Sequence, residues 1–243
     1  MKFRLFLLIH VLVLAFVNST FCIDKKEVSF KTEDGFTIKA TLQTPETGSN
    51  LPAVILIHQG GSDRSEWKSL VKKLGEQQFI TLAYDVRGHG SSDKVESISS
   101  LFNDPNQAPL DMKAAITFLR NHEKVDPFRI AIVGASIGGN LACVGSGDLA
   151  YGIKTAVSMS AKTSAVKNLA GEGKQLSIKS VFYISSEKEQ KGTRAKWSRE
   201  LYDQTSEPKK ITIVEGSRAH GVGIFKDDPK LEDDIINWLK KTL

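Results

Sequence analysis

Residues 129–140 read RIAIVGASIGGN, and this stretch is the most informative part of the sequence for predicting the fold. After Arg129 it runs through aliphatic residues, as in a strand buried on both faces. The chain then passes Gly-x-Ser-x-Gly, with Gly134 and Gly138 two positions either side of Ser136. A serine on a sharp strand-to-helix turn needs such neighbours, because side chains there would collide. The stretch predicts a nucleophilic Ser136 above the edge of a sheet, where the following helix N-terminus favours negative charge.

Alternating strands and helices extend this unit along the chain. Further strands are predicted at 53–58, 79–84, 155–159, 180–184 and 210–214. Helical spacing of apolar residues predicts helices at 65–78, 110–120, 138–144 and 231–243. This alternation predicts an α/β fold with a mostly parallel central sheet and helices on both faces.

Two features lie outside this alternation. Residues 28–31 and 36–43 flank the turn Glu33-Asp34-Gly35 and predict an N-terminal antiparallel hairpin. Asp126 and Pro127 are expected to break the chain before the strand 129–133.

Glycine-rich polar segments follow several of the predicted strands. They are His-Gln-Gly-Gly at 58–61, DVRGHGSS at 85–92 and Ala-His-Gly at 219–221. With Asp34-Gly35 and the serine motif, they make the sequence resemble the α/β-hydrolase superfamily over roughly residues 27–243. The resemblance is greatest to its compact esterases and dienelactone-hydrolase-like members. It implies catalytic residues in the chain order serine, acid, histidine.

Particular residues match these roles. His220 follows the last strand and precedes the final helix, so it is the expected general base for Ser136. Glu189 stands where relatives usually carry aspartate, and Glu187 is left open as the alternative acid. The amides of Gly60 and Ile137 are the expected oxyanion-hole donors.

The remaining histidines and cysteines are interpreted as structural. His58 and His89 are expected to brace loops beside the site, and His122 lies in a charged surface stretch. Cys143 is expected to be a small buried apolar residue. The resemblance requires no metal or other cofactor, and no cluster of His, Cys and Asp has metal-ligand spacing.

The segment 160–179 is too short for a helical cap over the site, so we expect no cap domain. An open site favours small or exposed acyl groups, and Phe102 is expected to form part of its rim. The leading interpretation is a carboxylic-ester hydrolase. The alternatives are a peptidase or amidase of the same fold and a catalytically degenerate binding protein.

Residues 1–22 have the layout of a secretory signal peptide, and 23–243 are expected to form a single domain. Basic Lys2 and Arg4 precede an apolar stretch at 5–17 and then small and polar residues. Export to the periplasm or the exterior is therefore expected. The alternatives are an uncleaved membrane anchor and lipidation at Cys22, although the preceding residue is large for a lipoprotein signal.

Net charge and composition exclude several other classes. The formal charge is +5 over 243 residues, and the lysines are interspersed with acidic residues. No basic block is interleaved with aromatic residues, so nucleic-acid binding is not expected. Two cysteines give no disulfide framework. The expected partner is a small ester or amide, with membrane association only through an uncleaved signal or a lipid on Cys22.

Overall fold

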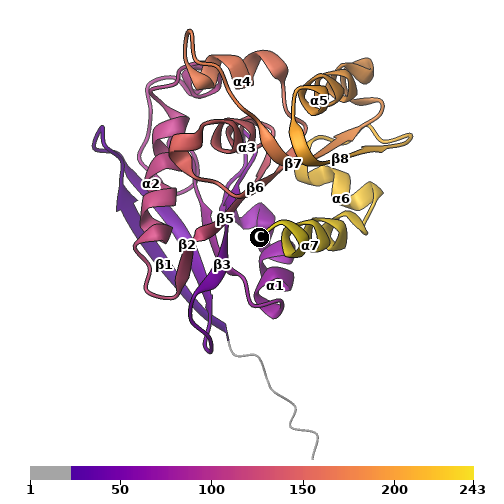
Figure 1. Ribbon diagram of the computed structural model, residues 1–243. Coiled ribbons are helices and arrows are strands. Elements are labelled where there is room, and N and C mark those ends of the chain that lie inside the picture. The colour runs from indigo at the N-terminus through magenta and orange to yellow at the C-terminus, as the bar shows by residue number, and fades with distance from the viewer. Residues whose placement is uncertain (1–22) are drawn as a thin grey trace, which may run out of the picture.

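The computed structural model describes residues 23–243 (Figure 1). The predicted signal peptide and Cys22 lie outside the described residues. Eight strands form a single sheet in the order β1-β2-β4-β3-β5-β6-β7-β8. The strands are β1 (Ile23–Lys31), β2 (Thr37–Pro45), β3 (Leu51–Ile57), β4 (Ile80–Tyr84), β5 (Val125–Ala135), β6 (Thr155–Met159), β7 (Lys179–Ser186) and β8 (Ser206–Val214).

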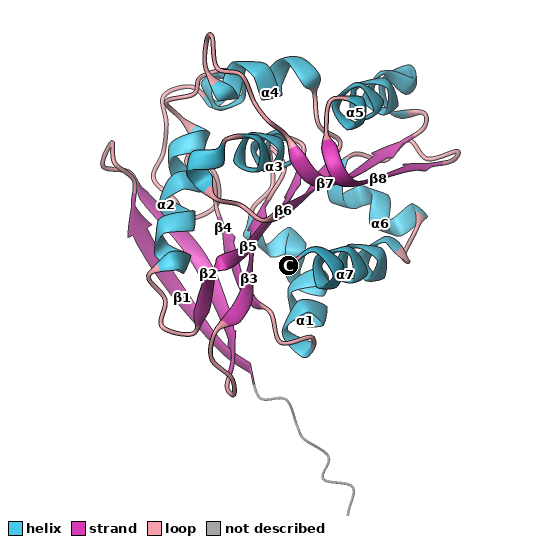
Figure 2. Ribbon diagram, in the orientation of Figure 1, coloured by secondary structure: helices cyan, strands magenta, loops and turns pink. Residues whose placement is uncertain are grey.

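Helices lie between most of the strands (Figure 2). They are α1 (Lys68–Glu76), α2 (Ala108–Arg120), α3 (Ile137–Gly147), α4 (Thr163–Ala170), α5 (Thr193–Asp203), α6 (Ile224–Asp227) and α7 (Leu231–Thr242). Short 3₁₀ turns precede or follow several of them: η1 (Arg64–Trp67), η2 (Ile98–Phe102), η3 (Leu149–Tyr151), η4 (Glu189–Gly192) and η5 (Gly221–Gly223).

The sheet is antiparallel at its N-terminal edge and parallel elsewhere. β1 pairs with β2 from Ile23↔Pro45 to Lys31↔Thr37, and β2 also runs antiparallel to β4. The pairs from β4 through β3, β5, β6 and β7 to β8 are all parallel. The predicted hairpin and the mostly parallel sheet are confirmed.

Apolar side chains alternate between the two faces of the sheet, as the period of a strand requires. In β5, Ile130 and Ile132 join one apolar cluster, whereas Ala131 and Val133 join the other. Helices α2 to α5 contribute to the first cluster, and α1, α6 and α7 contribute to the second. Figure 1 shows these two groups on opposite sides of the sheet, so the predicted three-layer arrangement is confirmed.

Two expectations about local structure were wrong. β5 begins at Val125 and continues through Pro127, where a break was expected. The pairing with β3 shifts register between Leu51↔Val125 and Ala53↔Ile130, so Pro127 lies in an irregular stretch that needs no regular amide donor. Helices α4 and α5 were not predicted; α4 has only 8 residues, and α5 is strongly polar with three buried residues.

No separate cap domain is present among residues 23–243. The segment between β6 and β7 contains only α4, which lies against α3. Val166 and Leu169 of α4 are buried in the same apolar cluster as α2 and α3. This helix therefore belongs to the layer that covers the sheet.

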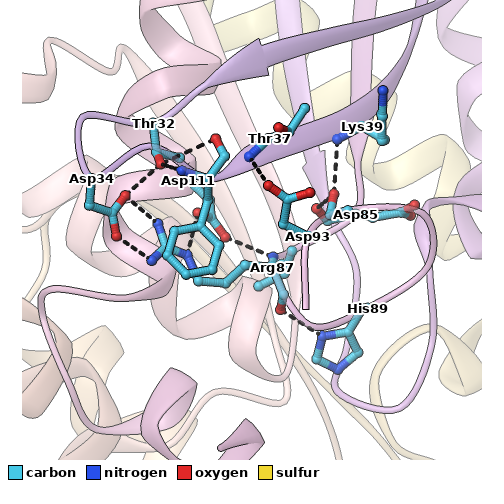
Figure 3. A network of polar contacts seen from close by, with 12 residues as sticks. Thr32, Asp34, Thr37, Lys39, Asp85, Arg87, His89, Asp93 and Asp111 are labelled. Carbon is cyan, nitrogen blue, oxygen red and sulfur yellow. Dashed lines mark hydrogen bonds and ion pairs between the residues drawn. The ribbon is translucent and has the colours of Figure 1, made fainter. Parts of the chain in front are cut away.

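A buried arginine joins the hairpin turn to α2 (Figure 3). Arg87, just after β4, donates from Nε to Asp111 Oδ1 over 2.7 Å and from a terminal nitrogen to Asp34 Oδ2 over 2.6 Å. Its backbone amide donates to Asp111 Oδ2 over 2.8 Å, and its guanidinium carbon lies 4.2 Å from the Phe36 ring centroid. The side chains of Arg87 and Asp111 are fully buried. This network fixes three segments that are far apart in the sequence.

The loop 85–93 is held to the hairpin by further contacts, also visible in Figure 3. Thr37 N donates to Asp93 Oδ2 over 2.6 Å, and Lys39 N donates to Ser92 Oγ over 2.9 Å. Ser92 Oγ in turn donates to the Asp85 carbonyl over 2.7 Å. The polar residues of this loop therefore stabilise the fold beside the carboxyl end of β4.

Candidate active site

Ser136 lies on the sharp turn between β5 and α3. Its backbone has φ 54° and ψ −110°, a left-handed φ that a side chain rarely adopts and that costs on the order of 1–3 kcal/mol. The turn is fixed on both sides, since Ser136 N donates to the Met159 carbonyl over 2.8 Å and Asn140 N donates to the Ser136 carbonyl over 2.9 Å. Strain at one serine, held by its surroundings, is typical of a functional residue.

The glycines around this turn are required by close backbone approach. A Cβ at Gly134 would overlap the Gly138 carbonyl, and a Cβ at Gly138 would overlap the Ile57 carbonyl. A Cβ at Gly139 would lie 2.5 Å from the Met159 carbonyl oxygen. The Gly-x-Ser-x-Gly pattern therefore has a steric cause here, because β5, β3 and α3 meet without room for side chains.

The two predicted oxyanion donors come from a helix N-terminus and a loop. Ile137 is the first residue of α3, and the first intrahelical bond starts only at Asn140, so the Ile137 amide has no intrahelical acceptor. Gly60 lies in the loop after β3, where a Cβ would come within 2.8 Å of Phe102 Cζ. Phe102 in η2 thus covers Gly60, which is consistent with its predicted place at the rim.

Side chains from three segments hold the loop around Gly60. Gln59 N donates to Glu66 Oε1 over 2.9 Å, and Gly61 N donates to His89 Nε2 over 3.2 Å. His58 Nε2 accepts from the Val86 amide over 3.0 Å.

The hydrogen bonds of His58 define its protonation. Because Nε2 accepts a bond, Nδ1 carries the proton that is donated to the Gln59 carbonyl over 2.8 Å. Burial lowers the pKa of His58 below its ordinary value, in keeping with a neutral ring. His58 and His89 therefore brace the loop, as the sequence analysis expected.

His220 and Glu189 lie in direct contact. His220 Nδ1 is 2.6 Å from Glu189 Oε1, and Glu189 is 5% exposed whereas the His220 side chain is 38% exposed. A carboxylate can only accept, so Nδ1 carries the proton and Nε2 is left with a free lone pair. An imidazole oriented in this way can act as a base through Nε2.

The alternative acid, Glu187, is placed differently. It is exposed, and its Oε2 accepts a hydrogen bond from the Gly216 amide over 2.8 Å. Glu187 thus holds the loop after β8, whereas Glu189 turns inward to His220. The two side chains diverge because the chain turns between them, where Lys188 has φ −103° and ψ 4° in place of an extended backbone.

Ser160 connects the segments that carry the candidate residues. Its hydroxyl donates to Glu189 Oε2 over 2.9 Å and accepts from the Gly221 amide over 3.1 Å. Ser160 directly follows Met159, whose carbonyl accepts from the Ser136 amide. The ends of β5, β6, β7 and β8 are thereby linked by hydrogen bonds at one edge of the sheet.

The loop that carries His220 is also held by side chains from the end of β7 and from α6. Ser186 Oγ donates to the Ala219 carbonyl over 2.7 Å, and it lies 2.7 Å from Ser217 Oγ. Ser217 contacts Asp227 in α6. These bonds hold the loop so that His220 stays at this edge of the sheet.

A family match agrees with this geometry. Residues 52–182, which are more than half of the chain, match the model of the family described as alpha/beta hydrolase fold. The chain belongs to the α/β-hydrolase fold family.

Two solved structures resemble this α/β hydrolase over most of its length. An esterase of Pyrococcus furiosus, Pf2001, gives a TM-score of 0.71 at 19% identity and covers 90% of this chain and 93% of its own. The acetyl xylan esterase from Paenibacillus sp. R4 gives a TM-score of 0.72 at 18% identity, over 91% and 84% of the two chains. At these identities the similarity shows the shared fold.

A curated relative is more similar in sequence but matches a shorter segment. Over 139 residues the hydrolase is 30% identical to the uncharacterized protein YfhR of Salmonella typhi. The match spans 53% of this chain and 44% of YfhR. The chain thus covers less than half the length of that relative.

Three residues at the site of this α/β hydrolase were not predicted from the sequence: Ser160, Arg194 and Glu66. Ser160 and Arg194 contact Glu189, and Glu66 contacts the Gln59 amide. No sequence pattern marks Arg194 or Glu66, since their contacts with Glu189 and the Gln59 amide depend on how α5 and η1 fold back beside those residues. For Ser160 alone a signal was available, because it ends a strand at the same edge of the sheet as Ser136.

Two further observations concern the described part of the hydrolase. Within residues 23–243, no group of three or more His, Cys, Asp or Glu side chains could hold a metal ion. None of the helices in that range has the length and apolar character needed to cross a membrane.

Proposed function

We propose that this protein is a serine hydrolase that cleaves carboxylic esters through a triad of Ser136, His220 and Glu189. The observation that carries the proposal is the pair at the end of the sheet, in which a buried carboxylate contacts His220 Nδ1 over 2.6 Å. The strained serine at the neighbouring strand end supplies the nucleophile, and the fold family is known for this order of residues.

The proposed reaction proceeds through an acyl-enzyme. His220 Nε2 takes the hydroxyl proton of Ser136 as the oxygen attacks the ester carbonyl. The amides of Gly60 and Ile137 donate to the oxyanion that forms, and loss of one such donor costs about 3–4 kcal/mol in related enzymes. Glu189 stabilises the imidazolium without taking its proton. The alkoxide leaves with a proton from His220, and water then releases the acid by the reverse sequence.

The substrate class follows from what surrounds the serine. No cap covers the described site, so nothing would enclose a long acyl chain. Short acyl groups, or acyl groups carried on a larger exposed molecule, suit such a site. Two structural neighbours are named as an esterase and an acetyl xylan esterase, and these names support proposing an ester as the substrate.

The proposal is tested by steady-state kinetics on p-nitrophenyl acetate, p-nitrophenyl decanoate and a peptide anilide. We expect kcat/KM to be highest for acetate and lowest for the anilide. Ser136→Ala should lower it by about 10³-fold or more, and Glu189→Gln by about 10²–10⁴-fold. Glu187→Gln is the matched control and should change it by less than about threefold.

Two outcomes would refute the proposal. Equal activity of Ser136→Ala and wild type would remove the serine from the mechanism. Hydrolysis of the anilide with no action on either ester would make the protein an amidase or peptidase.

We also propose that the protein is exported and that residues 1–22 are removed. The support is the basic, apolar and small-residue layout of that segment. N-terminal sequencing of the mature protein tests this, and a mature chain that begins at Met1 would contradict it. A mature chain that begins with a lipid-modified Cys22 would instead indicate an anchored protein.

A further inference from the structure

A positive charge lies beside the proposed triad acid. Arg194, near the start of α5, places Nε 3.2 Å from Glu189 Oε1, the same oxygen that His220 Nδ1 contacts over 2.6 Å. The other oxygen, Oε2, accepts from Ser160 over 2.9 Å. The carboxylate is therefore shared between a histidine and an arginine.

Arg194 is fixed in place by contacts of its own. Its side chain is 12% exposed, and a terminal nitrogen donates to the Ser160 carbonyl over 2.8 Å. The guanidinium carbon lies 5.2 Å from the Trp197 ring centroid. Nε makes no hydrogen bond, so its contact with Glu189 is an ion pair that acts through charge.

The buried position of the Arg194 guanidinium strengthens its electrostatic effect on Glu189. Burial lowers the pKa of Arg194, although the charge of Glu189 opposes this. An arginine still remains protonated at neutral pH. Because little water screens the group, its field acts strongly on the neighbouring carboxylate.

We propose that Arg194 is a positioning residue of the triad, which weakens the hold of Glu189 on protonated His220 and so extends activity to lower pH. This inference rests on the proposed function. A carboxylate stabilises an imidazolium beside it, and a cation on the same oxygen offsets part of that attraction. His220 then loses its proton, and becomes able to act as a base, at a lower pH than with Glu189 alone.

Other charged groups near His220 are the same in all variants of the test. Glu66, in η1, is near enough for the charge of His220 to act on its carboxyl, and it accepts from the Gln59 amide. Asp227, in α6, contacts Ser217 in the loop that carries His220. Neither changes when Arg194 is replaced, so a shift in the pH profile reports on Arg194.

The test compares Arg194→Gln with Arg199→Gln, a matched control that removes the same charge from an exposed position of the same helix. Glutamine removes the charge and keeps a polar side chain, which is shorter than that of arginine. The readouts are kcat/KM for p-nitrophenyl acetate and the rate of fluorophosphonate labelling, each from pH 5 to pH 9. We expect the midpoint of the acid limb to rise by about 0.5–1 pH unit in Arg194→Gln alone.

The outcomes separate the proposal from a purely structural role. Arg194→Lys keeps the charge, so its midpoint should remain at the wild-type value even where kcat falls. An unshifted midpoint in Arg194→Gln would overturn the proposal, whatever happens to kcat. Should Arg194→Gln fail to fold, the pH profile of Arg194→Lys becomes the test. A raised midpoint of its acid limb would overturn the proposal. A wild type that neither hydrolyses nor labels would overturn the proposed function and this inference together.

Discussion

Replacing Arg87 by methionine should destabilise the protein strongly. The side chains of Arg87 and Asp111 are both 0% exposed, and Asp34 on the hairpin turn is 31% exposed. Methionine has similar length but no charge, so Asp111 is left buried without its partner. Removing one member of a buried pair costs about 3–5 kcal/mol, because the remaining charge is no longer compensated.

The molecule offers a matched control for this change. Lys113 and Glu33 join the same two segments, α2 and the hairpin turn, but their side chains are 52% and 54% exposed. Lys113→Met should therefore cost no more than about 1 kcal/mol. Urea denaturation followed by circular dichroism gives both free energies of unfolding. Equal losses of unfolding free energy in the two variants would contradict this prediction, because they would mean that burial does not make the Arg87 pair more stabilising than the exposed pair.

The loss in Arg87→Met should also depend on pH. Burial raises the pKa of Asp111 to about 6, against 3.8 for a free side chain, so in the wild type stability is lost as the pH rises from 3.8 to 6. Without Arg87 the pKa rises further, and stability continues to fall above pH 6. The difference between variant and wild type should thus be larger at pH 8 than at pH 6, by about 1 kcal/mol for a further pKa rise of one unit. A difference that is constant over this range would contradict the assignment.

Two further predictions concern packing near the active site. Gly138→Ala places a Cβ against the Ile57 carbonyl and should lower the free energy of unfolding by at least about 1–3 kcal/mol. The Cβ in Gly223→Ala meets no atom closer than 3.7 Å, so this variant should lose less than about 1 kcal/mol. Thermal unfolding of both variants checks this difference. Burial raises the pKa of the Cys143 thiol to about 11. In a Cys22→Ser chain this thiol should therefore not react with Ellman's reagent at pH 8 until urea unfolds the protein. Rapid reaction of the native chain would contradict the burial of Cys143.

The serine turn could be predicted because its cause is local. Gly134, Ser136 and Gly138 are within four positions of one another, and a Cβ at Gly134 would overlap the Gly138 carbonyl inside the turn itself. The close approach of Gly138 to the Ile57 carbonyl of β3 is seen only in the structure. The alternation of strands and helices predicted the layers for the same reason, since each element carries its own apolar pattern. Pro127 was misjudged because a bulge in β5 accommodates it, and a bulge depends on the partner strand.

The choice between Glu189 and Glu187 could not be made from the sequence. The two residues are two positions apart in the same turn, and the non-extended backbone of Lys188 between them leaves Glu187 exposed and Glu189 buried. The contact of Arg194 with the carboxylate depends on how α5 packs, which no local pattern encodes. Contacts that depend on the direction of a turn or on the packing of a helix thus require the structure.

The central claim is that Ser136 is an activated nucleophile, and fluorophosphonate labelling tests it most directly. The mature protein is labelled at pH 8, digested, and mapped by mass spectrometry, with Ser136→Ala as the control. We expect one adduct, on the peptide that contains Ser136, and none in the variant. A folded wild type without an adduct, or equal labelling of Ser136→Ala, would contradict it.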